Sequence, residues 1–519
     1  MRLRNICWYL GVFLIADALI NLLPWIVAFI YGEDPVPILS LVIIAMILGG
    51  ILIKTFPRRE ISFSETMMLV VITFIAVSLL GAIPYMFVLS GNIENVIIDS
   101  IFESVSGYTT TGLTIFPKEI YLNQDNGVYH SLIFRRTLSE WIGGLGIVIL
   151  FLSLFARGGL SSVYLYKIAY GNEKIAPSVA HTSRIVLRIY LFYTLVGTIL
   201  FYLSGIDAFH AICATMSLLA TGGFIGNVFS DANFKFNLVT EIIIMSIMLI
   251  AAIPFTIHQK VFSRNLTKKD LKYIEVKWLF LIVISSILIY IVVASKHNID
   301  PISNLDQIGI GVISIVTTTG YSSGDLHTNL QDESKGLDTL SDSSKVLVFL
   351  LMSIGACAGS TAGGLKIVRL TILWSTFKNF IKKCSLPEHA IVPIKIEKRI
   401  FSIEEVKTVA LFFFIYLSLE IISAQLILLS MEFSNMNIDV GDAMVVSASA
   451  LGTNGISPRD IRELPAITKI ILIIEMLAGR LEIIPLFALF GYILKKTVEK
   501  ERVTLEDSIK MIKKLSRMK

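Results

Sequence analysis

The chain has 519 residues, of which 54% are hydrophobic and 16% charged, and its net charge at pH 7 is +5. Its mean hydropathy is +0.74. Soluble globular chains carry about 25% charged residues, so this composition excludes an ordinary soluble domain and predicts a polytopic membrane protein. The four cysteines lie far apart without metal-ligand spacing, and they predict neither a metal site nor a disulfide framework.

Ten apolar segments are predicted to cross the membrane. They lie at residues 8–31, 38–56, 66–90, 132–156, 186–205, 237–258, 278–296, 345–377, 406–431 and 466–494. The first has a charged start and an apolar run, as a signal peptide does, but the run is long and lacks a small-residue cleavage site. We therefore expect it to be kept as the first membrane helix.

Between the later crossings the same short pattern occurs four times. Each copy has an Asp, a dozen or so apolar or small residues and a turn of Thr and Gly, which is too short for the roughly 20 residues of a crossing. The copies begin at Asp99, Asp207, Asp306 and Asp442. Such repetition predicts an architecture, here four units of span, pore helix, turn and span, with the first two spans as an extra unit.

The division that follows has six parts. Residues 1–60 form an N-terminal two-helix unit; the four repeats are 61–160, 161–262, 263–385 and 386–494; residues 495–519 are a cytoplasmic tail.

Four short helices that end in glycine turns indicate a cation pathway. Backbone carbonyls can replace the water around a cation, and glycine tolerates the positive φ that aligned carbonyls demand. Non-helical backbone at membrane depth is allowed where it lines a cavity, and a helix C-terminus favours a cation there. The alternative is that these turns merely end helices. We expect the Asp residues to cap the helix starts, although they and Glu103 could also attract cations.

Lys and Arg residues concentrate in loops 157–188, 258–277 and 378–407 and in the tail after 494, all on the side away from the turns. Because cytoplasmic loops carry the excess of positive charge, both termini are predicted to be cytoplasmic, with the turns open to the outside. These loops could bind anionic lipid or dock a partner. The acidic, Ser-rich run 322–344 is predicted to be an exposed outer loop.

A glycine-rich stretch interrupts the span 345–377 at Gly355, Gly359, Gly363 and Gly364. Small residues can serve close helix packing, but this many glycines favour a broken helix that forms a movable loop below the turns. Arg480 lies within the last span, where an ionisable residue is a functional candidate. It could pair with Glu482 or line the pathway as a positive charge.

Other charged residues near the membrane have simpler interpretations. Lys366, at the end of the glycine-rich stretch, is a weaker functional candidate than Arg480, and its simpler interpretation is a side chain that snorkels at the inner interface. Arg135, Arg136 and Glu140 are interpreted as interface charges at the outer end of their span.

The sequence lacks a Walker loop, a dinucleotide-binding GxGxxG, an HExxH motif and a nucleophile elbow, so we do not expect an enzyme. A secondary transporter with inverted repeats is the main rival class. The four repeats share one orientation, which favours a channel-like pathway and leaves ion coupling open.

These motifs resemble the Trk/Ktr/HKT superfamily of potassium transporters, in its bacterial Trk/Ktr membrane (pore) subunit branch. The resemblance rests on the four turns, on SEWIGGLG at 139–146, on GACAGSTAGGLK at 355–366 and on AGRLE at 478–482. The N-terminal pair of spans looks like the Trk type. The fourth turn, SALGTNGIS at 449–457, is closer to the Ktr type, because the Trk form usually has Gly-Pro-Gly there.

The resemblance implies an all-α polytopic membrane protein, with the four repeats in a pseudo-fourfold arrangement around one pore. It also implies a homodimer, a cytoplasmic ring of nucleotide-binding regulatory subunits, and K+ as the transported ion without an organic cofactor in this chain. The implied filter, with K+ at its carbonyls, is Thr110-Thr111-Gly112, Ala220-Thr221-Gly222, Thr318-Thr319-Gly320 and Thr453-Asn454-Gly455.

Plant relatives with Ser in the first turn favour sodium, so Gly112 implies potassium. The gate implied by the family is the loop of Gly355, Gly359, Gly363 and Gly364, with Arg480 beside the pathway. The expected function is potassium uptake across the cytoplasmic (inner) membrane of a prokaryote. The alternative is a sodium- or proton-coupled symporter with lower potassium selectivity.

Overall fold

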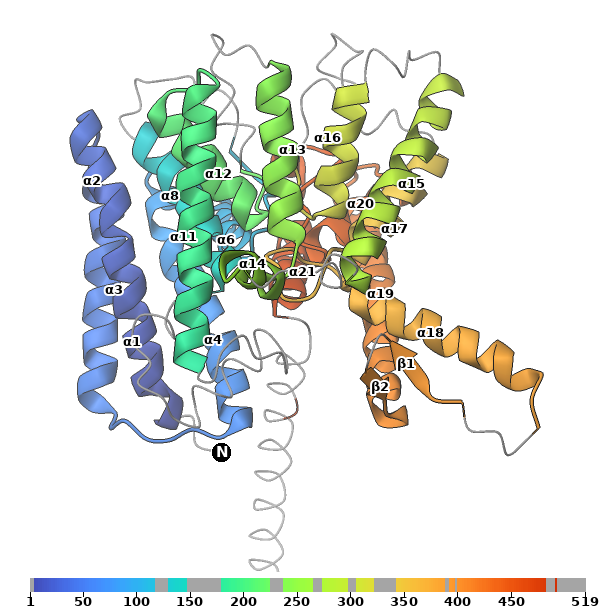
Figure 1. The fold of residues 1–519 in the computed structure, drawn as a ribbon. Coiled ribbons are helices and arrows are strands. Elements are labelled where there is room, and N and C mark those ends of the chain that lie inside the picture. The colour runs from blue at the N-terminus through green and yellow to red at the C-terminus, as the bar shows by residue number, and fades with distance from the viewer. Residues whose placement is uncertain are drawn as a thin grey trace, which may run out of the picture.

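The computed structural model of the chain describes residues 4–116, 129–146, 179–224, 237–264, 273–296, 305–321, 342–387, 392–396, 399–481 and 491. Within these ranges the chain is mostly helical, with two short strands (Figure 1). Six of the described helices are long and apolar enough to cross a membrane, and a bent pair makes a seventh. The predicted class, an all-α polytopic membrane protein, is confirmed.

The N-terminal unit consists of three helices, α1 (Arg4–Ile20), α2 (Leu22–Tyr31) and α3 (Val36–Thr55). α1 and α3 lie side by side at one edge of the molecule (Figure 1). They cross where two glycines face each other: a Cβ added at Gly11 would lie 2.7 Å from the Gly49 carbonyl oxygen, and a Cβ at Gly49 equally close to that of Gly11. Small residues permit this close approach of two membrane helices.

The described helices that follow fall into four groups in chain order. The first contains α4 (Phe63–Gly81), α5 (Ile83–Met86), α6 (Ile93–Tyr108) and α8 (Tyr129–Leu145). The second contains α11 (Val179–Leu203), α12 (Ala208–Ala220), α13 (Leu238–Ala252) and α14 (Phe255–Phe262). The third contains α15 (Ile274–Lys296), α16 (Leu305–Val316), α17 (Asp342–Ile354) and α18 (Ile367–Cys384). The fourth contains α19 (Ile403–Phe433), α20 (Val440–Leu451), η4 (Ile461–Glu463) and α21 (Ala466–Arg480).

Between the third and fourth units the chain forms a small hairpin of β1 (Ile394–Ile396) and β2 (Arg399–Phe401), which pair antiparallel with Ile394 opposite Phe401. The hairpin and α18 project from one end of the helical body (Figure 1). The predicted tail 495–519 and most of the predicted loops 157–188 and 322–344 lie outside the described residues, as do the last parts of the spans 132–156 and 466–494.

The predicted span 237–258 is not one straight helix. It breaks at Ile253-Pro254 into α13 and α14, whose axes differ by 104°. A proline lacks the N–H that would continue the helical ladder, and it restrains the preceding residue to an extended conformation. The freed backbone groups are paired elsewhere, because the Gly359 carbonyl accepts from Phe255 N (2.9 Å) and the Ala251 carbonyl from Thr361 Oγ1 (3.1 Å).

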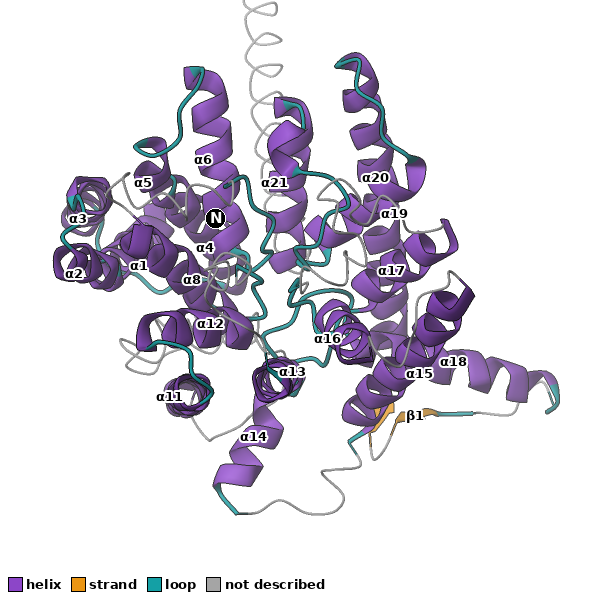
Figure 2. Cartoon of the chain, turned by 90° about the horizontal axis from the view of Figure 1, so that it is seen from above, coloured by secondary structure: helices purple, strands orange, loops and turns teal. Residues whose placement is uncertain are grey.

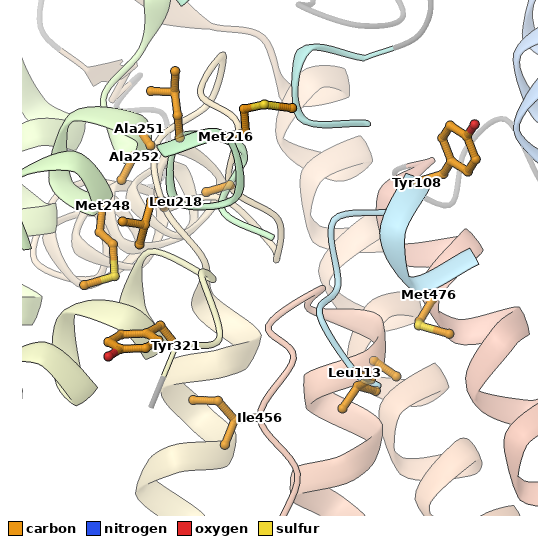
Figure 3. Close-up of a cluster of buried hydrophobic side chains, with 14 of the residues drawn as sticks. Tyr108, Leu113, Met216, Leu218, Met248, Ala251, Ala252, Tyr321, Ile456 and Met476 are labelled. Atoms are coloured by element: carbon orange, nitrogen blue, oxygen red, sulfur yellow. The ribbon is translucent and has the colours of Figure 1, made fainter. Parts of the chain in front are cut away.

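The short helices α6, α12, α16 and α20, called the pore helices below, surround the centre of the molecule. Seen from above, the loops that follow them come together there, enclosed by longer helices (Figure 2). The centre is closely packed: Leu113, Tyr321 and Ile456, which follow three of the turns, are buried in one cluster with Met248 of α13 and Met476 of α21 (Figure 3).

Candidate functional site

All four pore helices end in the same hydrogen-bonded turn. At the end of α6, Thr110 N donates to Gly107 O (3.0 Å) and Thr111 N to Ser106 O (2.9 Å), which is a Schellman motif. The same pair of bonds closes the other three helices, from Thr221 and Gly222, from Thr318 and Thr319, and from Thr453 and Asn454. The turns are therefore four copies of one backbone conformation.

In each copy a threonine occupies the left-handed position at which helices usually place glycine. The φ angles are 55° at Thr110, 53° at Thr221, 55° at Thr318 and 52° at Thr453. This conformation costs a residue with a Cβ roughly 1–2 kcal/mol, and a β-branched side chain is an outlier there. All four threonines are buried. Because backbone strain of this kind concentrates at functional sites, its fourfold occurrence marks these turns as the candidate site.

The residue two positions after each of these threonines is a glycine with positive φ, and the four glycines form a closed ring of contacts. A Cβ added at Gly112 would lie 2.1 Å from the Gly222 carbonyl oxygen, and one at Gly223 2.5 Å from that of Thr319. A Cβ at Gly320 would lie 1.7 Å from the Asn454 oxygen, and one at Gly455 2.1 Å from that of Thr111. The four turns therefore contact one another in the order of the repeats. At each contact there is no room for a side chain on the glycine.

The ring corrects the predicted register of the second turn. The segment Thr221-Gly222-Gly223 matches Thr110-Thr111-Gly112 in hydrogen bonds and φ angles, whereas Ala220-Thr221-Gly222 was expected. Ala220 is the last residue of α12 and lies before the turn. Gly222 has a different constraint: a Cβ there would lie 2.3 Å from the carboxyl carbon of Glu140. In the first, third and fourth turns the ring contains the predicted triplets.

Side chains make the first and third turns alike and distinguish them from the second and fourth. In the first turn the hydroxyls of Thr109 and Thr111 bond to each other at 2.8 Å, and in the third turn those of Thr317 and Thr319 do the same at 2.8 Å. The second and fourth turns carry Ala220 and Gly222, and Gly452 and Asn454, at the matching positions. The first and third turns thus resemble each other more closely than either resembles its neighbours.

The glycine-rich stretch 355–366 is a loop, as one of the two interpretations predicted. α17 ends at Ile354 and α18 begins at Ile367. Gly355, Gly359 and Gly364 have φ of 69°, 72° and 74°, values that few other residues adopt. The alternative, an unbroken helix with small residues for packing, is excluded.

This loop lies against the ring at its left-handed threonines. Gly363 N donates to Thr318 Oγ1 (2.8 Å), and a Cβ at Gly363 would lie 2.1 Å from Thr453 Oγ1. The loop is held from the other side by Glu275 at the start of α15, whose carboxylate accepts from Ala358 N at 2.7 Å. Lys366, expected to snorkel at the interface, is instead buried and donates to the Ala362 carbonyl within the loop.

Arg480, the last residue of α21, connects the loop to the first repeat. Its Nη1 donates to the Thr361 carbonyl (2.9 Å), and its Nη2 donates to the carbonyls of Gly143 and of Gly144 (3.1 Å) at the end of α8. Gly143 itself packs on the turn, since a Cβ there would lie 2.2 Å from the Tyr108 carbonyl oxygen. Glu482, the expected alternative partner, lies outside the described residues.

The interpretation of Arg136 and Glu140 as interface charges is wrong, because both side chains are completely buried behind the ring. Arg136 Nη2 forms an ion pair of 2.5 Å with Glu103 Oε1, and its guanidinium lies 3.9 Å from the centre of the Phe224 ring. Glu140 accepts from Phe224 N (2.9 Å) and from the Ser217 hydroxyl. These buried charged side chains therefore fix the segments that follow the first and second turns.

Glu103 does not attract cations at the outer mouth, because it is buried. Its Oε2 accepts from Ile115 N (3.0 Å) and its carboxylate from the Thr114 hydroxyl, three and two residues beyond the ring glycine Gly112. A partial sign of this network was visible in the spacing of Arg136 and Glu140, which stand one helical turn apart on α8. The partner on α6 could not be identified from spacing alone.

We expect Glu103→Gln to lower the free energy of unfolding by about 3–5 kcal/mol, because it leaves the buried Arg136 without a counter-charge. Thermal unfolding in detergent measures the change. Glu94→Gln, at an exposed position of the same helix, is the matched control and should behave as wild type. The double variant Glu103→Gln/Arg136→Met should recover part of the loss; a single variant as stable as wild type would contradict the assignment.

The expectation that an Asp caps each pore helix holds for Asp207, whose carboxylate accepts from Phe209 N and His210 N. It is wrong for two others. α6 begins at Ile93, so Asp99 lies within the helix, where it pairs with Lys469 at 2.6 Å. Asp442 lies in the first turn of α20 and pairs with Lys345 at 2.6 Å. Asp306 lies in the first turn of α16.

Helices that are long and apolar enough to cross a membrane, four short helices that end in the same turn and a ring of backbone contacts define the class: a multi-pass membrane transport protein. A family model described as "TrkH: Cation transport protein" matches residues 37–498. The chain belongs to the TrkH family of cation transport proteins, and it is a transporter of the Trk/Ktr membrane-subunit type rather than an enzyme.

Relatives cover nearly the whole chain. An uncharacterised cation transporter of Methanocaldococcus jannaschii is 29% identical over 501 residues, which are 96% of this chain and 97% of the relative. The Trk system potassium uptake protein TrkH of Salmonella typhimurium is 28% identical over 507 residues, 94% and 99% of the two chains. The crystal structure of the potassium transporter TrkH from Vibrio parahaemolyticus superimposes with a TM-score of 0.78 at 25% identity, covering 94% and 98%.

Proposed function

We propose that the chain takes up potassium ions through a channel-like pathway whose selectivity filter is the ring of four turns. The observation that carries this proposal is the closed series of glycine-to-carbonyl contacts, which brings backbone carbonyl oxygens of all four turns together at the centre of the molecule. Rings of backbone carbonyls replace the hydration shell of K+ in known filters. Relatives along the full length are named as potassium uptake proteins, which supports the same ion.

The proposed filter consists of the left-handed threonine, the next residue and the glycine of each turn. K+ is the transported substrate. The filter segments are 110–112, 221–223, 318–320 and 453–455. The first ring position is Gly112 rather than the Ser found in sodium-preferring plant relatives, which favours potassium.

The loop 355–366 is the proposed gate. It contacts Thr318 and Thr453 of the filter, so an ion cannot continue past these residues until the loop moves. Arg480 fastens the loop to α8 and places a positive charge beside the pathway. This combination of block and charge would keep the resting flux low.

The assembly is part of the same proposal. Both termini and the basic loops face the cytoplasm, with the four repeats divided at residues 61–160, 161–262, 263–385 and 386–494. The chain works as a homodimer in the inner membrane of a prokaryote, and a ring of nucleotide-binding subunits docks on the basic loops and moves the gate.

Flux into liposomes tests the proposal. We expect K+ and Rb+ to enter at least about tenfold faster than Na+ and Li+, a preference that corresponds to about 1.4 kcal/mol. Equal rates for Na+ and K+ would contradict the filter. Uptake that requires an imposed sodium or proton gradient would support the alternative, a coupled symporter of lower potassium selectivity.

A further inference from the structure

A buried carboxylate of the N-terminal unit reaches the first pore helix. Asp17 of α1 is 5% exposed, although an ionisable side chain within a membrane helix is costly without a partner. Its Oδ1 accepts from the Tyr108 hydroxyl at 2.8 Å, and its Oδ2 accepts from Asn21 Nδ2 at 3.1 Å. Helix α1 of the N-terminal unit therefore forms a charge-assisted hydrogen bond to α6 of the first repeat, in addition to its apolar contacts.

Tyr108 occupies a sensitive position. It is the last residue of α6 and stands two residues before the left-handed Thr110. Its hydroxyl also accepts from Arg135 Nη2 at 3.2 Å, and the guanidinium of Arg135 lies 5.2 Å from the centre of the Tyr108 ring. Both side chains are fully buried, so Arg135 is not an interface charge either. The hydroxyl is thus fixed between a cation of α8 and an anion of α1.

The surrounding backbone leaves this side chain little freedom. A Cβ added at Gly81 of α4 would lie 2.7 Å from Arg135 Nη2 and 2.8 Å from Tyr108 Cε2. On the other side, the Tyr108 carbonyl is in contact with Gly143 of α8. A change in the position of the hydroxyl therefore has to be transmitted to the end of α6 and to the turn.

The other three pore helices have no such polar residue at this place. The residues that match Tyr108, each two positions before the left-handed threonine, are Leu219, Val316 and Leu451, and all are buried. The tyrosine is therefore particular to the first repeat, which is the repeat on which the N-terminal unit packs through α1 and α4.

We propose that Asp17 is a specificity-determining positioning residue for the filter. By holding the Tyr108 hydroxyl against Arg135, it fixes the end of α6 and with it the Thr111 carbonyl, which is in contact with Gly455 in the ring. The selectivity of a carbonyl filter depends on the size of its ion sites and the number of its oxygens. The N-terminal helices then serve ion choice and not only membrane anchoring. This inference rests on the proposed function of the ring.

The test compares K+ and Na+ flux into liposomes for Asp17→Leu and Tyr108→Phe. Each variant removes the hydrogen bond from a different side, and each should lower the K+-over-Na+ flux ratio by about tenfold or more, the effect of losing a hydrogen bond to a charged group. The double variant should be no worse than the poorer single variant, because both act through one bond. Leu19→Ala, an exposed position of the same helix, is the matched control and should keep the wild-type ratio.

The outcomes separate this inference from a purely structural role. A structural role would lower the thermal stability and the total flux of both ions and leave their ratio unchanged, and that result would overturn the inference. If Asp17→Leu does not fold, Tyr108→Phe decides, since it changes no charge. A wild-type protein without K+ preference, measured first in the same vesicles, would instead overturn the proposed function of the ring.

Discussion

Gly320→Ser is expected to abolish the preference for K+ over Na+, the largest effect we expect from a single residue. A Cβ at this position would lie 1.7 Å from the Asn454 carbonyl oxygen, and its φ of 74° is strained for serine. The collision is with backbone, which cannot rotate away, so the third and fourth turns must separate. Isotope flux in liposomes should show equal rates for the two ions, or no flux.

Gly309→Ser is the matched control for this prediction. It lies in α16 before the same turn, and the nearest atom to an added Cβ is Met245 Sδ at 3.6 Å, an ordinary contact. Its selectivity should be that of wild type. A Gly320→Ser protein that still selects K+ would exclude the third turn from the filter.

The register of the second turn has its own test within the same assay. Gly223→Ser should impair selectivity as Gly320→Ser does, because Gly223 faces the Thr319 carbonyl. Ala220→Ser should be tolerated. The matching Thr109 and Thr317 already carry hydroxyls that bond to the carbonyl four residues earlier, at 2.7 Å in both cases. Equal damage by the two variants would contradict the corrected register.

Arg480→Ala is expected to raise the resting K+ flux by about tenfold or more in the absence of any partner. The change removes the hydrogen bonds from the guanidinium to the Thr361, Gly143 and Gly144 carbonyls, and a bond to a charged group stabilises by about 1.5–3 kcal/mol. The loop is then free to leave the ring. Rubidium uptake into liposomes measures the resting flux.

Arg462→Ala serves as the control for lost positive charge, because Arg462 is exposed in η4, just before α21, and pairs with Asp460. It should leave the resting flux unchanged. Gly363→Ala provides a second approach to the gate, since its Cβ would collide with Thr453 Oγ1 and displace the loop. Wild-type flux in both Arg480→Ala and Gly363→Ala would exclude the loop as the gate.

Those features that depend on local pattern could be predicted from the sequence. The apolar runs identified the six described helices that are long and apolar enough to cross a membrane, and the repeated Thr and Gly residues identified the four turns. The broken helix at 355–364 was also predicted, because several glycines within ten residues strongly disfavour a continuous helix. The break of α13 was missed, although Ile253-Pro254 was a visible signal for it.

What could not be predicted depends on positions in space. Thr221 is followed by two glycines, so the residue order offered no reason to choose Gly223; the choice is set by φ and by the contact with the third turn. Burial of Arg136 and Glu140 was likewise invisible, because charged residues near a helix end usually face water. Their partners come from α6 and α12, which the order of the sequence does not place beside them.

The break of α13 has a consequence for how the pathway opens. In the structure the Ala251 carbonyl and the Phe255 N–H, which the break at Pro254 leaves without helical partners, are paired with Thr361 and Gly359 of the loop that we propose as the gate. When the loop withdraws, the Ala251 carbonyl and the Phe255 N–H lose their hydrogen-bond partners. Each group left buried without a partner would destabilise the open state by about 1–3 kcal/mol. Only water that enters the pathway can replace these hydrogen bonds, so the pathway must fill with water as the loop leaves. Opening and hydration are then one event, and a dehydrating environment would hold the transporter shut.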